Sequence, residues 1–81
     1  MQISVLAFAR IRELLGFSRK SIQMPDCSTI GAAWSIYEAE NSELALLAPS
    51  TRFALNGKIA NPEAMLHDGD ELAFFPPVGG G

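Results

Sequence analysis

Two apolar segments near the ends of the chain constrain its fold most strongly. Residues 2–8 read QISVLAF, and residues 71–75 read ELAFF. Because successive side chains of a strand point to opposite faces of a sheet, both segments place apolar residues on both faces. Strands of this kind usually lie at the centre of a sheet. We therefore expect the first and last strands to lie side by side in the middle of one sheet.

One long amphipathic helix is predicted between these two strands. Segment 26–41, DCSTIGAAWSIYEAEN, carries an apolar stripe with the i, i+3, i+4, i+7 spacing of a helix face. Asp26 or Ser28 can accept a hydrogen bond from the first turn and so cap this helix. The stripe, which we expect to belong to the core, consists of Ile30, Ala33, Trp34 and Tyr37.

Shorter elements are expected on either side of the long helix. ARIRELLG at 9–16 has the spacing of a short helix that ends at Gly16. SRKSIQM at 18–24 suits a second strand that ends before Pro25. SELALLAPS at 42–50 is interpreted as a short apolar connection.

Two turn signals complete the predicted order of elements. Asn56-Gly57 within TRFALNGKIA predicts a β-hairpin, and Asp68-Gly69 predicts a further turn before the last strand. The whole order predicts an α+β fold with a mixed sheet of four to five strands. The long helix packs on one face of that sheet, and a short helix follows the first strand.

The other face of the sheet is expected to carry an apolar patch. Phe74 and Phe75 are neighbours on a strand, so one points to the helix and the other to the open face. The first strand likewise has two sets of apolar side chains that point to opposite faces. Either Leu6 with Phe8 or the odd-numbered residues must lie on the open face. The alternative is that residues 44–66 fold over this face.

Composition excludes several classes of function. The 81 residues form one domain with a formal net charge of −3 and scattered basic residues, which gives nucleic-acid binding little electrostatic support. A single cysteine, Cys27, rules out an internal disulfide and a multi-cysteine metal site. The start MQISVLAFAR lacks the pattern of a signal peptide or a membrane span. We expect a cytoplasmic protein with no membrane, nucleic-acid or metal partner.

Conventional catalytic groups are also missing. His67 lies beside a turn and is expected to be solvated. Cys27 has no base nearby in the sequence, so we interpret it as a helix-entry or buried thiol and not as a nucleophile. Glu38, Glu40 and Glu43 are interpreted as the solvated side of a helix end.

The C-terminal carboxylate of Gly81 is the remaining candidate for a reactive group. Gly79, Gly80 and Gly81 lack Cβ atoms, so an extended tail could enter a narrow channel of another protein. Pro76 and Pro77 fix φ near −65° and are expected to direct the tail away from the sheet. The alternative is that the terminal glycines are frayed chain.

Three segments resemble MoaD, the family of small subunits of molybdopterin synthase. They are FARIRELLG at 8–16, LNGKIA at 55–60 and LHDGDELAFFPPVGGG at 66–81, and the resemblance covers essentially the whole chain. The resemblance implies a ubiquitin-like β-grasp domain over residues 1–75. Residues 76–81 would then be an extended, flexible tail that ends in the activatable glycine.

The resemblance also implies a role as a sulfur carrier that is not catalytic on its own. An adenylating enzyme similar to MoeB would use ATP to activate Gly81, which then becomes a thiocarboxylate. A large subunit similar to MoaE would receive the sulfur to make the dithiolene of molybdopterin, in a heterotetramer of two small and two large subunits. This chain would bind no cofactor itself. Phe74 would belong to the core, and the implied partner-binding residues are Phe8, Ile59, Phe75, Pro76, Pro77, Gly79 and Gly80.

Some features depart from the family pattern, and other functions stay open. Trp34 stands where a leucine-like residue is usual, Gly31 is unusual in the first turn of the long helix, and Gly79 is at a variable position. One alternative is a ubiquitin-like modifier that becomes attached to lysines of target proteins. Another is a sulfur carrier for a different pathway, such as thiamine biosynthesis, although FFPPV before the tail favours MoaD.

Overall fold

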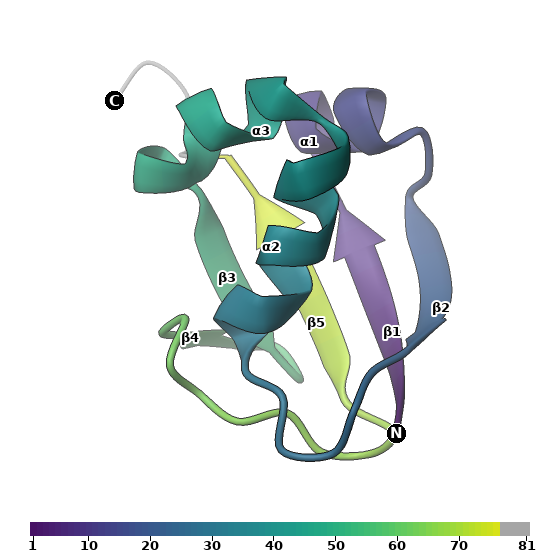
Figure 1. Cartoon of the computed structure of the whole chain (residues 1–81). Coiled ribbons are helices and arrows are strands. Elements are labelled where there is room, and N and C mark those ends of the chain that lie inside the picture. The colour runs from purple at the N-terminus through teal and green to yellow at the C-terminus, as the bar shows by residue number, and fades with distance from the viewer. Residues whose placement is uncertain (77–81) are drawn as a thin grey trace.

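The computed structural model describes residues 1–76, which form helices on one side of a sheet (Figure 1). No helix in this part of the chain is long and apolar enough to cross a membrane. In chain order the elements are β1 (Gln2–Ala7), α1 (Ala9–Leu15), β2 (Arg19–Gln23), α2 (Ile30–Glu40), α3 (Ser42–Leu47), a 3-10 helix (Ala48–Ser50), β3 (Arg52–Leu55), β4 (Lys58–Ala60) and β5 (Glu71–Phe75).

The first and last strands lie side by side at the centre of the sheet, as the sequence predicts. The strand order is β2-β1-β5-β3-β4. β1 and β5 are parallel, with Val5 opposite Leu72 and Ala7 opposite Phe74, whereas the other three pairs of strands are antiparallel. The sheet is therefore mixed, and the predicted α+β fold is confirmed.

The core lies between α2 and the sheet, and aromatic rings fill its centre. Phe74 is fully buried, and the rings of Trp34 and Phe53 meet it edge-on at centroid distances of 5.2 and 5.6 Å. The Tyr37 ring contacts it from the next turn of α2 at 6.1 Å. Such edge-to-face pairs each contribute about 0.5–1.5 kcal/mol beyond the burial of their surface. The predicted stripe on the long helix is thus confirmed as core.

The predicted N-cap of α2 is wrong. Thr29 is the cap residue, and its Oγ1 accepts a hydrogen bond from the Ala32 amide at 3.1 Å. The hydroxyl of Ser28 instead donates to the Pro25 carbonyl at 2.7 Å. Asp26 lies 3.6 Å from the N-terminal amine of Met1, so its carboxylate serves an ion pair and not the helix.

The segment interpreted as an apolar connection is also different from the prediction. It forms α3 and the 3-10 helix that follows it. Asn41 begins α3, because its Oδ1 accepts from the Glu43 amide at 3.0 Å while its Nδ2 donates to the Leu14 carbonyl at 3.2 Å. Leu44 is fully buried and anchors the helix in the core.

Gly31, unusual in the first turn of α2, contacts the segment after β4. Its amide donates to the Pro62 carbonyl at 2.9 Å. A Cβ atom built on Gly31 would lie 3.4 Å from the same carbonyl oxygen. This is an ordinary van der Waals distance, so the contact with the segment after β4 does not by itself require glycine at this position.

The predicted hairpin between β3 and β4 is confirmed. Asn56 and Gly57 have φ values of 51° and 84°, the left-handed conformations that a tight hairpin turn requires. The Asn56 side chain also joins the turn to β5, because its Oδ1 accepts from the Glu71 amide at 2.9 Å. This bond joins the hairpin to the last strand, and the pairing of β3 with β4 places Ile59 opposite Ala54.

Candidate functional site

The open face of the sheet carries a continuous apolar surface. Strand alternation places the buried residues of β1 and β5 toward α2, so the residues between them face the other way. Strand pairing sets Leu6 opposite Ala73, Ala73 opposite Ala54, and Ala54 opposite Ile59, in one row across four strands. We define the open-face patch as Leu6, Phe8, Ala54, Ile59, Ala73 and Phe75.

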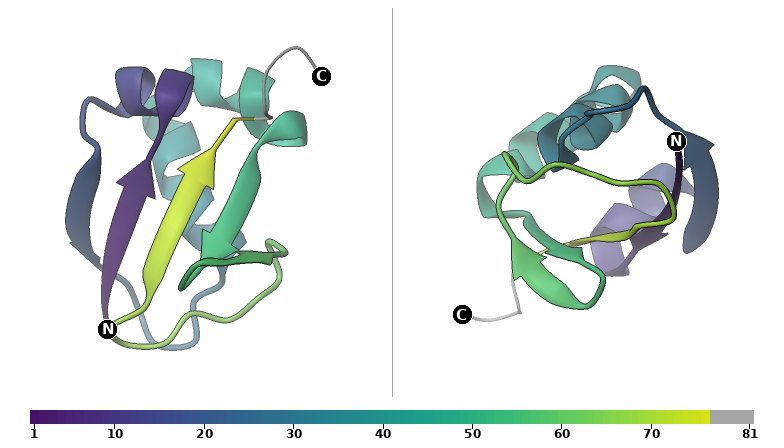
Figure 2. Two further views of the ribbon diagram at one scale, coloured as in Figure 1. Left: turned by 180° about the vertical axis from the view of Figure 1, so that it is seen from behind. Right: turned by 90° about the horizontal axis from the view of Figure 1, so that it is seen from below.

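The open-face patch is accessible from solvent. Seen from behind, the strands lie in front of α2 and α3, and α1 lies at the upper end of β1 (Figure 2). Phe8 is 47% exposed and Ile59 is 69% exposed. Ile59 belongs to the segment 44–66 that could have covered this face, and it lies in the sheet instead. Within residues 1–76, segment 44–66 therefore does not fold over the open face.

The two adjacent phenylalanines of β5 are divided between the two faces as expected. Phe74 is fully buried under α2, whereas Phe75 is only partly buried and lies opposite the exposed Arg52 of β3. Phe8 continues the ladder beside them, because its amide donates to the Phe74 carbonyl at 3.2 Å. Phe8 and Phe75 therefore lie at the same end of the open face.

The chain leaves the sheet at this end of the open-face patch. β5 ends at Phe75, and Pro76 is the last described residue. The structure thus brings Phe8, Ile59 and Phe75 to one face beside the start of the C-terminal segment. Their role in partner binding stays a prediction. The other predicted site residues, Pro77, Gly79, Gly80 and Gly81, lie outside the described residues.

The two arginines of the open face differ in whether a carboxylate neutralises their charge. The Arg19 guanidinium is bound to the Glu71 carboxylate at 2.8 Å, which neutralises one side of the face. Arg52, on the other side of β5, has no carboxylate within 4.0 Å among residues 1–76. Within residues 1–76, the apolar surface is therefore bordered by the Arg19–Glu71 ion pair and by Arg52, which forms no ion pair there.

The other polar candidates of the sequence do not assemble into a catalytic or metal site within the described part of the chain. The His67 side chain is 76% exposed, as expected for a solvated residue. Cys27 is at the entry to α2 but is exposed and not buried. Glu38 is half-buried and accepts from the Trp34 Nε1 at 2.9 Å, so it is not simply solvated. Residues 1–76 contain no group of acidic, histidine or cysteine side chains that could hold a metal.

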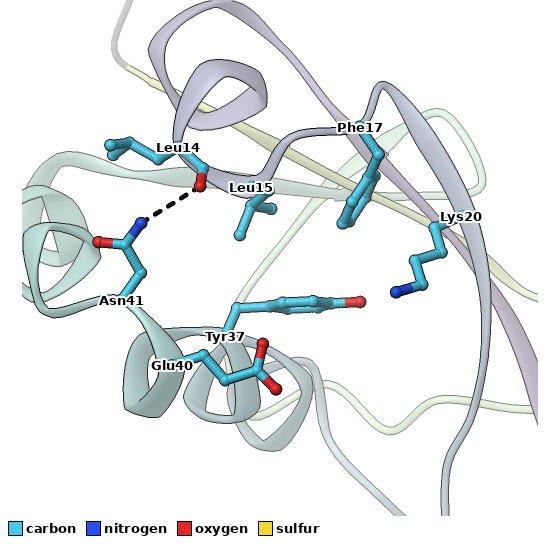
Figure 3. A pocket seen from close by; sticks show the side chains of 7 residues that line it. All are labelled: Leu14, Leu15, Phe17, Lys20, Tyr37, Glu40 and Asn41. Atoms are coloured by element: carbon cyan, nitrogen blue, oxygen red, sulfur yellow. Dashed lines mark hydrogen bonds between the residues drawn. The ribbon is translucent and has the colours of Figure 1, made fainter.

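The structure also has a shallow cleft of about 170 Å³ on the helical side, which the sequence does not predict (Figure 3). Its wall combines apolar side chains of α1 and the following turn with the ring of Tyr37 and the charged groups of Lys20 and Glu40. Burial and, to a smaller extent, the Glu40 charge raise the pKa of Tyr37, so its hydroxyl stays protonated at neutral pH. No sequence motif indicates this cleft, because its residues come from three separate elements.

Comparison with known proteins identifies the family. The model described as "ThiS family" matches residues 5–81. The chain belongs to this family. A molybdopterin synthase sulfur carrier subunit of Escherichia coli is 37% identical over 81 residues, which cover 98% of this chain and 99% of that protein. The resemblance to the small subunits of molybdopterin synthase is thereby confirmed.

Solved structures of similar proteins agree with the fold. The complex of subunits 1 and 2 of molybdopterin-converting factor from Helicobacter pylori contains a chain with a TM-score of 0.69 and 27% identity, and the match covers both chains completely. SAMP1 from Haloferax volcanii matches with a TM-score of 0.80 and 25% identity, again over the whole of both chains. The fold is the ubiquitin-like β-grasp, as the resemblance implies.

Proposed function

We propose that this chain is the sulfur carrier of a molybdopterin synthase and that the carboxylate of Gly81 is its reactive group. The proposal is supported by full-length similarity to sulfur carrier subunits and by the chain's terminal sequence FFPPVGGG. The observation that carries it is the position of the open-face patch. This accessible apolar surface borders the place where the chain leaves the sheet toward Gly81.

The chemistry follows from the low reactivity of a carboxylate. One oxygen of the Gly81 carboxylate attacks the α-phosphorus of ATP, which forms an acyl adenylate and releases pyrophosphate. A sulfur nucleophile at the oxidation level of sulfide then attacks the carbonyl carbon and displaces AMP. The product is a thiocarboxylate in which one carboxylate oxygen has been replaced by sulfur. Both steps take place on an adenylating enzyme that binds the ATP, and this chain contributes the carbonyl carbon.

The thiocarboxylate sulfur is then passed on within a complex with a large subunit. The open-face patch is the docking surface for that subunit, because apolar patches on a protein surface are common sites of protein–protein interaction. Docking at this face delivers the adjacent C-terminal segment to the active site of the large subunit. Two thiocarboxylates supply the two sulfurs of the dithiolene, and the complex is a heterotetramer.

Reconstitution tests the proposal directly. The chain is incubated with its cognate adenylating enzyme, ATP and sulfide, and its intact mass is measured. The expected product is heavier by the difference between sulfur and oxygen, and a chain that lacks Gly81 should remain unchanged. No mass change in the complete chain, with an adenylating enzyme shown to be active, would contradict the proposal.

The modifier alternative is favoured by the match to SAMP1 of Haloferax volcanii, which is a small archaeal modifier protein. It predicts attachment of the C-terminus to lysines of other proteins. Proteomic analysis of cells that express the chain would then find glycine-glycine remnants on target lysines. The sulfur carrier proposal instead predicts the thiocarboxylate and its consumption when large subunit and cyclic pyranopterin monophosphate are added.

A further inference from the structure

Arg52 is the one arginine of the open face whose charge is not neutralised by a carboxylate in the described part of the chain. It lies opposite Phe75 in the pairing of β3 with β5, so its side chain leaves the sheet on the face that carries the open-face patch. Arg19, the other arginine of that face, is already bound to Glu71 at 2.8 Å. The Arg52 guanidinium is therefore available to bind a carboxylate of a partner, whereas the Arg19 guanidinium is already paired.

A hollow of about 240 Å³ lies beside Arg52, at the edge formed by β3 and β4. Ile59 lines it, so the hollow is continuous with the open-face patch. Pro49 and Pro62 form apolar parts of its wall. The hollow thus extends the proposed docking surface sideways to the edge of the sheet.

The polar groups of the hollow favour an anionic occupant. No aspartate or glutamate lines it within residues 1–76. The Thr51 hydroxyl is already used, because it donates to the Leu47 carbonyl at 2.8 Å. Arg52 and Asn61 also line the hollow, and their side chains form no hydrogen bond or ion pair within residues 1–76, so both can donate to an occupant. A carboxylate is the acceptor that a guanidinium fork binds best.

We propose that this hollow binds an acidic side chain of the large subunit, with Arg52 as the residue that pairs with the carboxylate. The inference rests on the proposed function, since it assumes that the open-face patch docks that subunit. Arg52 would add charge recognition to a mainly apolar contact. Charged groups at the border of an interface chiefly set specificity, association rate and salt dependence.

The test compares three single variants in titrations with the cognate large subunit at low and high salt. Arg52→Glu should weaken binding about tenfold or more at low salt, because it places like charges together. Arg52→Gln should weaken binding by roughly threefold, the size typical of losing an exposed ion pair. Both penalties should shrink at high salt because exposed charges are screened.

Arg19→Gln is the matched control, because it changes the net charge by the same amount on the same face. It should leave the affinity within about twofold of the native value, since the Arg19 charge is already engaged by Glu71. Equal effects of Arg19→Gln and Arg52→Gln would overturn the proposal, because they would show that only the net charge of the face matters for binding. Restoration of Arg52→Glu binding by one Asp→Lys or Glu→Lys exchange in the large subunit would identify the bound carboxylate.

Two other occupants of the hollow give different results. If Arg52 binds the C-terminal carboxylate of its own chain, the penalty of Arg52→Glu should vanish in a chain whose terminal carboxylate is amidated. If the hollow binds a second copy of this chain, Arg52→Glu should change the sedimentation of the isolated protein. Either result would overturn the inference.

The outcome also separates this inference from the proposed function. If Arg52→Glu binds the large subunit normally while Phe75→Ala binds poorly, the charge recognition is wrong and the docking surface stands. If neither change affects binding, the docking surface itself is wrong.

Discussion

The two faces of the sheet use similar residues for different purposes, and β5 shows this most directly. Phe74 is enclosed by Trp34, Tyr37 and Phe53 under α2. Phe75, one residue later, lies on the face that no helix covers within the described chain. The covered face supplies the free energy of folding, and the open face presents apolar surface for a partner. In a chain of 81 residues, one strand serves both tasks because its side chains alternate.

The largest expected effect is on the covered face. Phe74→Ala should lower the free energy of unfolding by about 3–5 kcal/mol, because it removes a fully buried ring and leaves a cavity. Chemical denaturation measures this loss. Phe74→Leu fills more of the space and should cost clearly less. A Phe74→Ala protein of native stability would show that the core is not where the aromatic contacts place it.

Phe75→Ala should give the opposite result. Binding to the large subunit should weaken by about 2–4 kcal/mol if Phe75 is an anchor of the interface, with little change in melting temperature. Calorimetric titration and thermal unfolding of the same preparation measure both quantities. A large loss of stability with unchanged affinity would place Phe75 in the core and reverse the assignment of the two faces.

A smaller effect is expected at the start of α2. Thr29→Ala removes the side chain that accepts from the Ala32 amide, and it should cost about 1 kcal/mol of stability. Ser28→Ala is the control, since the Ser28 hydroxyl bonds to Pro25 and does not cap the helix. Denaturation curves in which Ser28→Ala costs more than Thr29→Ala would contradict the observed cap.

The smallest expected effect is on the pH dependence of stability, through Tyr37 on the covered side of the sheet. Burial raises the pKa of Tyr37 in the folded protein above its ordinary value of 10.0, so folding favours the protonated hydroxyl. Its contribution to stability is full below that ordinary value and is lost as pH rises through the higher folded pKa. Tyr37→Phe should therefore weaken the alkaline decline in unfolding free energy. An identical decline in the variant would exclude Tyr37 as its source.

Periodicity predicted the covered face well, because burial imposes a pattern on every strand and on α2. Ile3, Val5 and Phe74 follow the alternation of their strands, and the stripe of α2 follows the helical period. Alternation alone could show that Phe74 and Phe75 diverge but not which of them faces α2. That assignment came from the resemblance, and the burial of Phe74 confirms it.

The prediction was weaker where tertiary contacts decide the outcome. The sequence predicts a connection at 42–50, because this segment is short and is closed by Pro49, yet Asn41 starts a helix there and Leu44 anchors it. Ser28 is as good a capping residue as Thr29, and only the position at which the helix begins selects between them. The hollow beside Arg52 joins segments before and after the hairpin, so no local pattern could indicate it.

Adenylation of a chain with a blocked end tests the central claim most directly. The cognate adenylating enzyme is assayed for exchange of pyrophosphate with ATP in the presence of the native chain or of a chain with one added residue after Gly81. The account predicts exchange with the native chain and none with the extended chain, at equal melting temperatures. Equal exchange with both chains would show that the Gly81 carboxylate is not the reactive group.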